Sequence, residues 1–452
     1  MKGFVSTRAI WRVAGLSASA VMLAAGFARA ATVQTLYPAS TLLSAVVKAA
    51  DGNFYGTSRY GGTDDVGTVF RLSPTGVYQV IYSFTGGADG SFPRAALTVG
   101  PDGQLYGTCQ YGGTNNAGGI FKITTSGSFT PLHVLAAATD GAEPVGGLTV
   151  GTNGMLFGTA SYGGASGFGT IFRITTGGNF TVLHTFSGSD GNGPVATLAA
   201  GADGLLYGTT QFGGTNDDGT VFKITTAGDF TPLFSFNGMD GAYPSAALAR
   251  GLDGALYGTT AYGGTGAFGS VFKITSGGVF VSLYSMTQEN LGSNPAGGLT
   301  LGEDGNFYGT VHYGGTNGFG SIFQVTTAGG FSPLYNFTGN DDGGNPMTAL
   351  ARGDNYTFFG ISSLGGTGGG GTFYALTLLH FDLIRRLANG QMDLQGAGGT
   401  PGGTYSLLTF TNLATEGTNW YFAGSGQFDN SGRFNLTNNA SGTERLYRLQ
   451  QP

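Results

Sequence analysis

Cysteine and charge are scarce in this sequence. Cys109 is the one cysteine among 452 residues, which excludes an intramolecular disulfide and a zinc site built on several thiolates. Only 10% of the residues are charged, and beyond the first 30 residues the one cluster of Lys and Arg is the pair Arg385–Arg386. Nucleic-acid binding needs a basic surface, so we expect no nucleic acid among the partners.

Motifs of common catalytic sites are also missing. The sequence has no His-Glu-x-x-His, Gly-x-Ser-x-Gly or Walker pattern. Two Gly-x-Gly-x-x-Gly runs begin at Gly264 and Gly366, but strand-like segments follow them, so hairpin loops explain them better than nucleotide binding. The four histidines are scattered. We therefore expect no catalytic residues and no enzyme activity, with a triad assembled from distant segments as the alternative.

The one long apolar run lies at the N-terminus. Basic residues at positions 2, 8 and 12 precede an apolar stretch, residues 13–27, and Ala28-Arg29-Ala30 offers small residues for cleavage before Ala31. This order is typical of a secretory signal peptide, and the stretch is short for a membrane-spanning helix. We predict a signal peptide over residues 1–30 and a secreted or cell-surface protein that does not span a membrane after cleavage. An uncleaved anchor is the alternative.

Glycine and aromatic residues are abundant instead. The chain has 87 glycines, 34 phenylalanines and 21 tyrosines, and 40% of its residues are hydrophobic. The strict Gly-X-Y period of collagen and the low hydrophobicity of disordered chains are both absent. This composition predicts a folded chain with a buried core and many tight turns.

A repeat of about 50 residues organises the sequence. One unit contains Asp203-Gly204-Leu205-Leu206-Tyr207-Gly208-Thr209 and continues with strand-like runs at 219–225, 229–236 and 246–250. The aromatic residue before Gly-Thr recurs every 50 or 51 residues, at Tyr55, Tyr106, Phe157, Tyr207, Tyr257, Tyr308 and Phe359. Four short strands per unit of 40–50 residues indicate the blades of a β-propeller.

The seventh unit has three such runs, because no fourth run follows residues 371–376. The missing run lies at the start of the chain, where residues 33–37 align with the fourth strands of the other units. We therefore predict an all-β fold with a seven-bladed β-propeller over residues 31–378, closed by this N-terminal strand. Such closure leaves no free edge at the ends of the array. A linear β-solenoid is the alternative.

The repeated Leu-Tyr-Gly-Thr, Tyr-Gly-Gly and Gly-Thr-Val-Phe-Lys-Ile-Thr segments resemble the GloVer tandem repeat of exported bacterial proteins over about residues 33–378. The resemblance implies export and a repeat domain without an established activity. Residues 379–452 leave the repeat, and their short strand-like runs resemble a small β-sandwich of fibronectin type III shape that commonly ends such proteins. We predict a separate C-terminal module there.

The candidate ligand-facing residues are the rings of the repeated Tyr-Gly-Gly motif. One ring per unit, in six of the seven units, ends the second strand beside the loops: Tyr60, Tyr111, Tyr162, Phe212, Tyr262 and Tyr313. Such rings stack on sugars in lectin-type propellers, but they also serve as packing wedges between blades, since large aromatics dominate cores. Both interpretations stay open at this point.

Acidic residues recur in the loops. Gly-x-Asp-Gly turns, or their equivalents, carry Asp89, Asp140, Asp190, Asp240 and the pair Asp341–Asp342, while Asp64–Asp65 and Asp217–Asp218 lie in other loops. Calcium needs several oxygens at short range, whereas Asp-Gly is also ordinary turn chemistry. We predict no metal and no cofactor, with calcium at these loops as the alternative.

Together these features predict a monomeric, exported, non-catalytic propeller that acts as a binding or cell-surface structural module. An extracellular glycan or a surface protein is the expected partner. The prediction rests on near-identical units without a unique polar cluster, which an active site normally requires. A lectin-like carbohydrate-binding propeller and a polysaccharide hydrolase or lyase are the alternatives.

Overall fold

The structure is a computed structural model that describes residues 8–13, 23–24, 31–41, 43–287, 292–295, 297–354, 356–386, 391–399, 402–410, 421–439 and 445–450. Every regular element in these ranges is a β-strand. Most of the predicted signal peptide lies outside the described residues, apart from the short strands β1 (Arg8–Val13) and β2 (Leu23–Ala24). The predicted signal peptide therefore stays a prediction.

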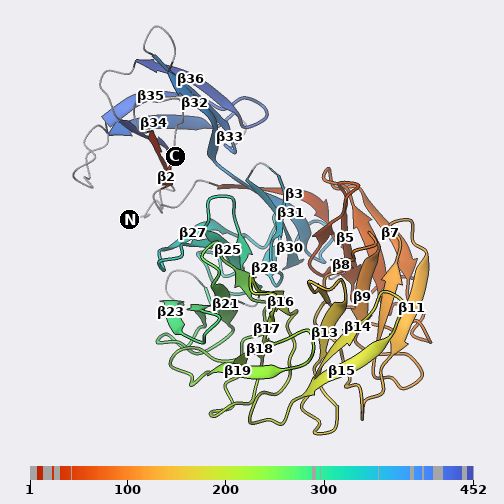
Figure 1. The fold of residues 1–452 in the computed structure, drawn as a ribbon. Coiled ribbons are helices and arrows are strands. Elements are labelled where there is room, and N and C mark those ends of the chain that lie inside the picture. The colour runs from red at the N-terminus through yellow and green to blue at the C-terminus, as the bar shows by residue number, and fades with distance from the viewer. Residues whose placement is uncertain are drawn as a thin grey trace.

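Six antiparallel sheets of four sequential strands, and a seventh sheet completed by the N-terminal strand, form the blades of a propeller (Figure 1). The first three are β4 (Val47–Lys48), β5 (Phe54–Ser58), β6 (Thr68–Leu72) and β7 (Tyr78–Ser83); β8 (Thr98–Val99), β9 (Leu105–Cys109), β10 (Gly119–Ile123) and β11 (Phe129–Val134); and β12 (Thr149–Val150), β13 (Leu156–Ala160), β14 (Thr170–Ile174) and β15 (Phe180–Thr185). The next three are β16 (Ala199–Ala200), β17 (Leu206–Thr210), β18 (Thr220–Ile224) and β19 (Phe230–Ser235); β20 (Ala249–Arg250), β21 (Leu256–Thr260), β22 (Ser270–Ile274) and β23 (Phe280–Ser285); and β24 (Thr300–Leu301), β25 (Phe307–Val311), β26 (Ser321–Val325) and β27 (Phe331–Asn336). The seventh combines β29 (Ala351–Arg352), β30 (Thr357–Leu364) and β31 (Thr372–Leu378) with β3 (Ala31–Pro38), and β28 (Gly344–Pro346) also pairs with β30.

The ring closes between the two ends of the repeat array. Strand β3 pairs antiparallel with β31, with Val33 opposite Leu376 and Tyr37 opposite Phe373. Tyr37 also stacks on Tyr78 of the first blade, with ring centroids 4.7 Å apart. The predicted all-β, seven-bladed propeller closed by an N-terminal strand is therefore confirmed, and the β-solenoid alternative is wrong.

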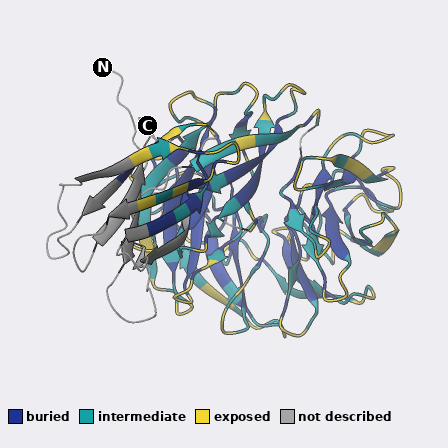
Figure 2. Cartoon of the chain, turned by 90° about the horizontal axis from the view of Figure 1, so that it is seen from above, coloured by how far each residue is buried: buried dark blue, intermediate teal, exposed yellow. Residues whose placement is uncertain are grey.

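Side-chain size explains the layers of each blade. Second strands such as β17 are buried at every position, and third strands such as β18 nearly so, because a blade is covered on both faces by its neighbours. Fourth strands alternate between half-buried and exposed residues. Burial therefore follows the inner strands of the blades, and the loops carry most of the exposed surface (Figure 2).

The innermost strands are shorter than the sequence predicts. Instead of the predicted 246–250, β20 pairs only over Ala249–Arg250. Near the axis, hydrogen bonds run to the next blade instead of along the ladder: the Thr98 hydroxyl donates to the Leu148 carbonyl at 2.5 Å, and the Thr300 hydroxyl to the Leu350 carbonyl at 2.6 Å. The small residues around the axis thus join blades to one another.

Aromatic stacks join the outer parts of the blades. In the first five blades the ring on the fourth strand lies flat on a phenylalanine of the next blade, as in Tyr82 on Phe129, with centroids 4.3 Å apart, and Phe234 on Phe280, at 4.0 Å. His133 and His184 occupy the same column and stack at 4.1 and 3.9 Å on Phe180 and Phe230. These two histidines therefore act as members of an aromatic column.

Six further strands follow the ring and lie to one side of it, beyond the seventh blade (Figure 1). One sheet contains β32 (His380–Arg386), β33 (Gln391–Ala397) and β36 (Phe434–Asn439), and the other contains β34 (Thr404–Phe410), β35 (Tyr421–Gln427) and β37 (Arg445–Gln450) together with β1 and β2. Tyr405 contacts Phe434 across the two sheets, with centroids 5.4 Å apart. The fibronectin-like sandwich over residues 379–452 stays a prediction.

Candidate functional site

A cavity of about 450 Å³ lies where the blades converge at one end of the central channel; we call it the mouth cavity. Its lining includes Arg59, Gln110, Ser161, Gln211, Ser245 and Ser363, which come from six of the seven blades. Residues so far apart in sequence meet only at the propeller axis. The volume falls within the range of small-molecule sites, roughly 300–1,000 Å³.

One residue per blade, at the end of the second strand, forms what we call the mouth column. Its members are Arg59, Gln110, Ser161, Gln211, Ala261, His312 and Ser363. The preceding position carries only small or aliphatic residues, such as Cys109, Thr210 and Val311, which are buried in the blade. The mouth column therefore differs from blade to blade where the surrounding repeat does not.

The rim of the cavity is built from residues in a left-handed conformation. Six residues that each precede a proline have φ between 51° and 65°: Phe92, Glu143, Gly193, Tyr243, Asn294 and Asn345. This conformation is strained for side chains such as those of Phe92 and Tyr243. Phe92 is held there because its N–H donates to Val66 of one loop, at 2.7 Å, and its carbonyl accepts from the N–H of Gln110. The rim backbone thus bridges adjacent blades.

Several polar atoms of the cavity wall are covered and have no hydrogen-bond partner. They are Arg59 Nε, Gln110 Oε1, Ser161 Oγ and Thr348 Oγ1. The sixth blade adds Asn294 Oδ1 and His312 Nδ1 at the equivalent rim and column positions. Gln110, Ser161 and His312 are only 5%, 1% and 9% exposed. Buried polar atoms are usually paired, so this concentration around one cavity indicates a ligand site.

The cavity wall is strongly polarised. On one side Gln110 Nε2 and the Tyr111 hydroxyl both donate to Glu143 Oε2, at 2.9 and 3.2 Å. Burial raises the pKa of Tyr111, and the Glu143 carboxylate adds to this rise. Next to them lie Arg59 and Arg94; burial lowers the pKa of Arg94, and the neighbouring Arg59 guanidinium lowers it further. Two like charges therefore share one wall.

The predicted ligand-facing rings lie around this mouth, with unequal exposure. Tyr60, Tyr162, Tyr262 and Tyr313 are 41%, 52%, 51% and 49% exposed, and Tyr162 also lines the cavity. Tyr111 is half-buried through its bond to Glu143. Phe212 is half-buried against Tyr243, with centroids 5.3 Å apart. Four of the six rings are thus accessible, and two are partly packed.

The acidic loop residues accept hydrogen bonds from the protein. Asp89 accepts from the Tyr82 hydroxyl at 3.0 Å and from the Thr85 N–H at 2.9 Å, and Asp342 is bonded in the same way to Tyr335 and Thr338. Asp217 accepts from the Gly213 N–H at 2.7 Å. No group of three or more potential metal ligands occurs within the described ranges. Calcium at these loops stays an untested alternative.

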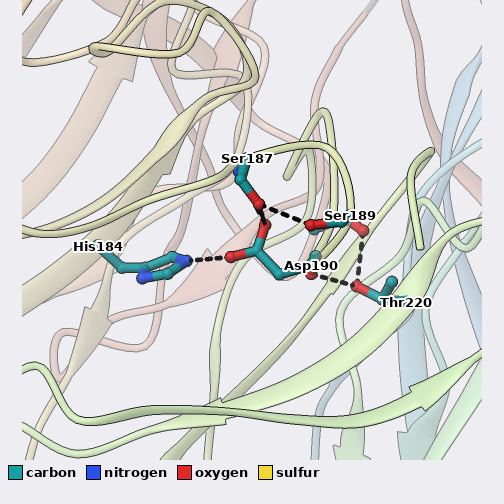
Figure 3. Close-up of polar contacts among 6 residues, drawn as sticks. His184, Ser187, Ser189, Asp190 and Thr220 are labelled. Carbon is teal, nitrogen blue, oxygen red and sulfur yellow. Dashed lines mark hydrogen bonds and ion pairs between the residues drawn. The ribbon is translucent and has the colours of Figure 1, made fainter. Parts of the chain in front are cut away.

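One acidic turn resembles a Ser-His-Asp triad in composition but not in arrangement (Figure 3). His184 Nε2 lies 3.0 Å from Asp190 Oδ2, and the Ser187 hydroxyl donates to Asp190 Oδ1 at 2.9 Å. A catalytic serine would instead bond to the histidine. The cluster closes the turn after β15 and has no role in the mouth cavity.

His184 gives the propeller a pH-dependent stability term. Burial lowers its pKa below the ordinary 6.5, and the Asp190 carboxylate opposes this only in part. The unfolded chain therefore binds a proton at a pH at which the folded chain does not, so stability is full above about pH 6.5 and falls as the pH drops below it. The His184→Tyr variant keeps a ring and a donor for Asp190, as Tyr82 does for Asp89. We expect its free energy of unfolding to fall less than that of the wild type between pH 7 and pH 5.5 in urea titrations; parallel pH profiles would refute this.

Comparison with known families identifies the repeat. The family described as the Gloeobacter/Verrucomicrobia repeat matches residues 31–201 and 176–374. The chain belongs to this family. Its repeat thus accounts for all seven blades, and the mouth column is one of the positions at which the units of this chain differ from one another. No curated protein sequence matches the chain.

Solved structures show the fold at low sequence identity. The extracellular domain described as that of a hybrid two-component system from B. thetaiotaomicron has 12% identity and a TM-score of 0.52; the match covers 95% of this chain and 56% of that one. This chain therefore spans little more than half of that protein's length. Puromycin hydrolase (11% identity, TM-score 0.48, 79% of this chain and 58% of that one) and a polysaccharide lyase, ulvan lyase, bound to -[GlcA(1-4)Rha3S]- (11%, 0.45, 75% and 93%) also match.

The sequence prediction missed the polar residues of this site. It rested on the absence of a unique polar cluster, and that premise is wrong, because Arg59, Arg94, Gln110 and Glu143 form one at the mouth. The feature of the sequence that could have revealed the site is the mouth column, because this position holds arginine, glutamine, histidine or serine in different units. Among the described residues we also find no apolar helix of membrane-spanning length.

A second cavity, of about 930 Å³, lies between the closing strand β3 and the C-terminal strands, lined in part by Gln34, His380 and Arg433. None of the unpartnered buried polar atoms found in the described part of the chain lines it. The mouth cavity is therefore the stronger candidate site.

Proposed function

We propose that this chain is an exported, non-catalytic binding protein whose propeller holds a saccharide in the mouth cavity. The observation that carries the proposal is the set of covered, unpartnered polar atoms, among them Gln110 Oε1 and Ser161 Oγ. Leaving such an atom unpaired costs about 1–3 kcal/mol. A ligand rich in hydroxyl groups offers donors and acceptors to several of them at once. The N-terminal leader pattern supports export.

The shape of the site supports a saccharide over a compact ion. The exposed ring of Tyr162 lines the cavity, and Tyr262 and Tyr313, at the equivalent positions of two other blades, are also exposed; aromatic faces are the usual platform for the apolar face of a sugar ring. A saccharide with its chain end inside the cavity would pair with the unpartnered polar atoms, and its further sugar units would lie over the exposed rings at the rim. This arrangement favours one site on the axis over one site per blade.

The chemistry of the wall supports binding over hydrolysis. Among the described residues that line the mouth cavity, Glu143 is the one carboxylate, whereas glycoside hydrolysis generally needs two carboxyl groups across the scissile bond. The hydrogen bonds from Gln110 and Tyr111 hold Glu143 as an acceptor, and the raised pKa of Tyr111 makes this phenol a poor base.

Calorimetric titration with an oligosaccharide panel tests the proposal. We expect one ligand bound per chain; several bound per chain would instead favour a lectin-like propeller with repeated pockets. The Tyr162→Ala variant should bind roughly two- to tenfold more weakly, because a ring contact contributes about 0.5–1.5 kcal/mol. Val279→Ala is the matched control, since this side chain is also exposed but lies in the turn between β22 and β23. Wild-type chain that binds no saccharide, or that releases shortened products, contradicts the proposal.

A further inference from the structure

Two guanidinium groups, those of Arg59 and Arg94, lie at the mouth without a salt bridge among the described residues. Arg59 and Arg94 both line the cavity, and the Arg59 guanidinium adds to burial in lowering the pKa of Arg94. The salt bridges of the described residues involve Lys48, His133, His184, Lys273 and Arg352, but neither of these arginines. Arg59 Nε is covered and has no hydrogen-bond partner.

The one carboxylate nearby does not neutralise this pair. Glu143 Oε2 accepts hydrogen bonds from Gln110 and Tyr111, and among the described residues Glu143 forms no salt bridge with Arg59 or Arg94. Two adjacent positive charges without a close counter-charge disfavour each other. An anionic group between them would relieve this repulsion.

The surroundings hold Arg59 in place, whereas Arg94 is exposed. The Arg59 guanidinium lies over the Tyr60 ring, with Cζ 5.3 Å from the centroid. Tyr60 packs edge-on against Phe92, with centroids 5.7 Å apart, and Phe92 packs against Tyr111 at 6.2 Å. Because the Phe92 backbone is tied to the loops of two blades, this aromatic run is a rigid support. Pre-positioned guanidinium groups suit planar or tetrahedral anions, which they bind through paired N–H donors.

We propose that the mouth cavity is selective for an acidic saccharide, with Arg59 and Arg94 binding its carboxylate or sulfate group and Gln110, Ser161 and Thr348 contacting neighbouring hydroxyls. This inference rests on the proposed function and adds the charge of the ligand. Of the four remaining mouth-column residues, Gln211, Ala261 and Ser363 carry no charge, and burial lowers the pKa of the fourth, His312, which favours its neutral form. The anion therefore binds on the side of the first two blades, and the rest of the ring faces neutral parts of the ligand.

Titration of the full chain with three oligosaccharides of equal length tests the inference: an oligogalacturonate, a sulfated chondroitin fragment and a neutral β-glucan. We expect one or both acidic ligands to bind at least tenfold more tightly than the neutral one. The Arg94→Gln and Arg59→Gln variants should each weaken the acidic ligand roughly tenfold, since charge-assisted bonds are the strong ones. Arg94→Lys should restore part of the loss, because lysine keeps the charge without the paired donors.

Arg250→Gln is the matched control, because this exposed arginine at the end of β20 makes the same change in net charge away from the cavity. A preference for either acidic ligand over the neutral one supports the inference, and a preference for the oligogalacturonate points to the carboxylate, since the chondroitin fragment carries carboxylates as well as sulfates. Equal binding of neutral and acidic ligands, unchanged in Arg94→Gln and Arg59→Gln, overturns the anion assignment but leaves saccharide binding intact. If none of the three ligands binds and a wider neutral panel is also blank, the proposed function fails with it.

Discussion

A Gly208→Val variant is expected to lose about 3 kcal/mol of unfolding free energy, and its transition midpoint in urea should fall accordingly. Gly208 lies in the buried strand β17, and a Cβ atom there would come within 2.4 Å of Phe222 Cζ and 2.7 Å of Leu198 Cδ2. Both neighbours are buried core side chains, so they cannot move aside freely. Overpacking of a dense core costs roughly 1–3 kcal/mol, and the two methyl groups of valine place the effect at the upper end.

The matched control is Gly177→Val in the turn between β14 and β15. The nearest heavy atom to a Cβ at this position is Thr175 Oγ1 at 3.8 Å, and the residue is exposed. We expect a change within about 0.5 kcal/mol, as for surface substitutions in general. Equal destabilisation by the two variants would show that the close approach of Phe222 does not require glycine.

The same contact explains why a glycine recurs in the second strand of every blade. At Gly56, Gly107, Gly158, Gly258 and Gly309, as at Gly208, a Cβ would meet the tip of the phenylalanine ring opposite. In the seventh blade Tyr374 takes the place of phenylalanine over Gly360, and its ring would be met at 2.3 Å. The glycine of the Tyr-Gly-Thr motif is therefore a steric requirement of the blade and does not indicate a function.

Two positions of the repeat, an aspartate and a tyrosine, change together, and the sequence alone shows this. The Asp203 carboxylate accepts a hydrogen bond from the Tyr207 hydroxyl at 2.6 Å, and Asp102 accepts from Tyr106 at 2.7 Å. In the third unit both residues change together, to Asn153 and Phe157. A carboxylate is kept where a phenol must be paired and is absent where none exists. Many of the aspartates in the turns are thus explained by local bonding.

The fold could be predicted because seven copies of one pattern constrain each other, and because residues 33–37 matched the strand missing from the last copy. The site could not be predicted in the same way. Arg59, Gln110 and His312 are 50 residues or more apart. The sequence of a single unit does not show which end of its second strand lies at the mouth of the channel. Left-handed backbone at Phe92 and Tyr243, which shapes the rim, is not a feature that aromatic residues before proline normally predict.

Deletion of the closing strand β3 is expected to destabilise the propeller strongly. A chain that begins at Ala39 lacks this strand, so its seventh blade is incomplete. It loses the contacts of the half-buried Val33 and Leu36 and the Tyr37–Tyr78 stack, which together amount to about 3 kcal/mol, since full burial of such a side chain contributes roughly 1.5–3 kcal/mol. It also exposes the unpaired edge of β31, which favours association with another chain. We expect a lower and broader thermal transition and a dimeric or aggregated fraction in size-exclusion chromatography with light scattering.

A chain that begins at Ala31 is the control for this deletion and should stay monomeric with the higher transition. A synthetic peptide of residues 31–38 should restore the transition of the shortened chain, since it supplies the register in which Val33 faces Leu376 and Thr35 faces Tyr374. The same peptide with proline at positions 33 and 35 should fail, because proline lacks the N–H donor that a ladder uses. If the shortened chain melts like the control without any peptide, then β3 does not hold the ring closed, and the rigid mouth on which the binding site depends must be stabilised by the contacts between blades alone.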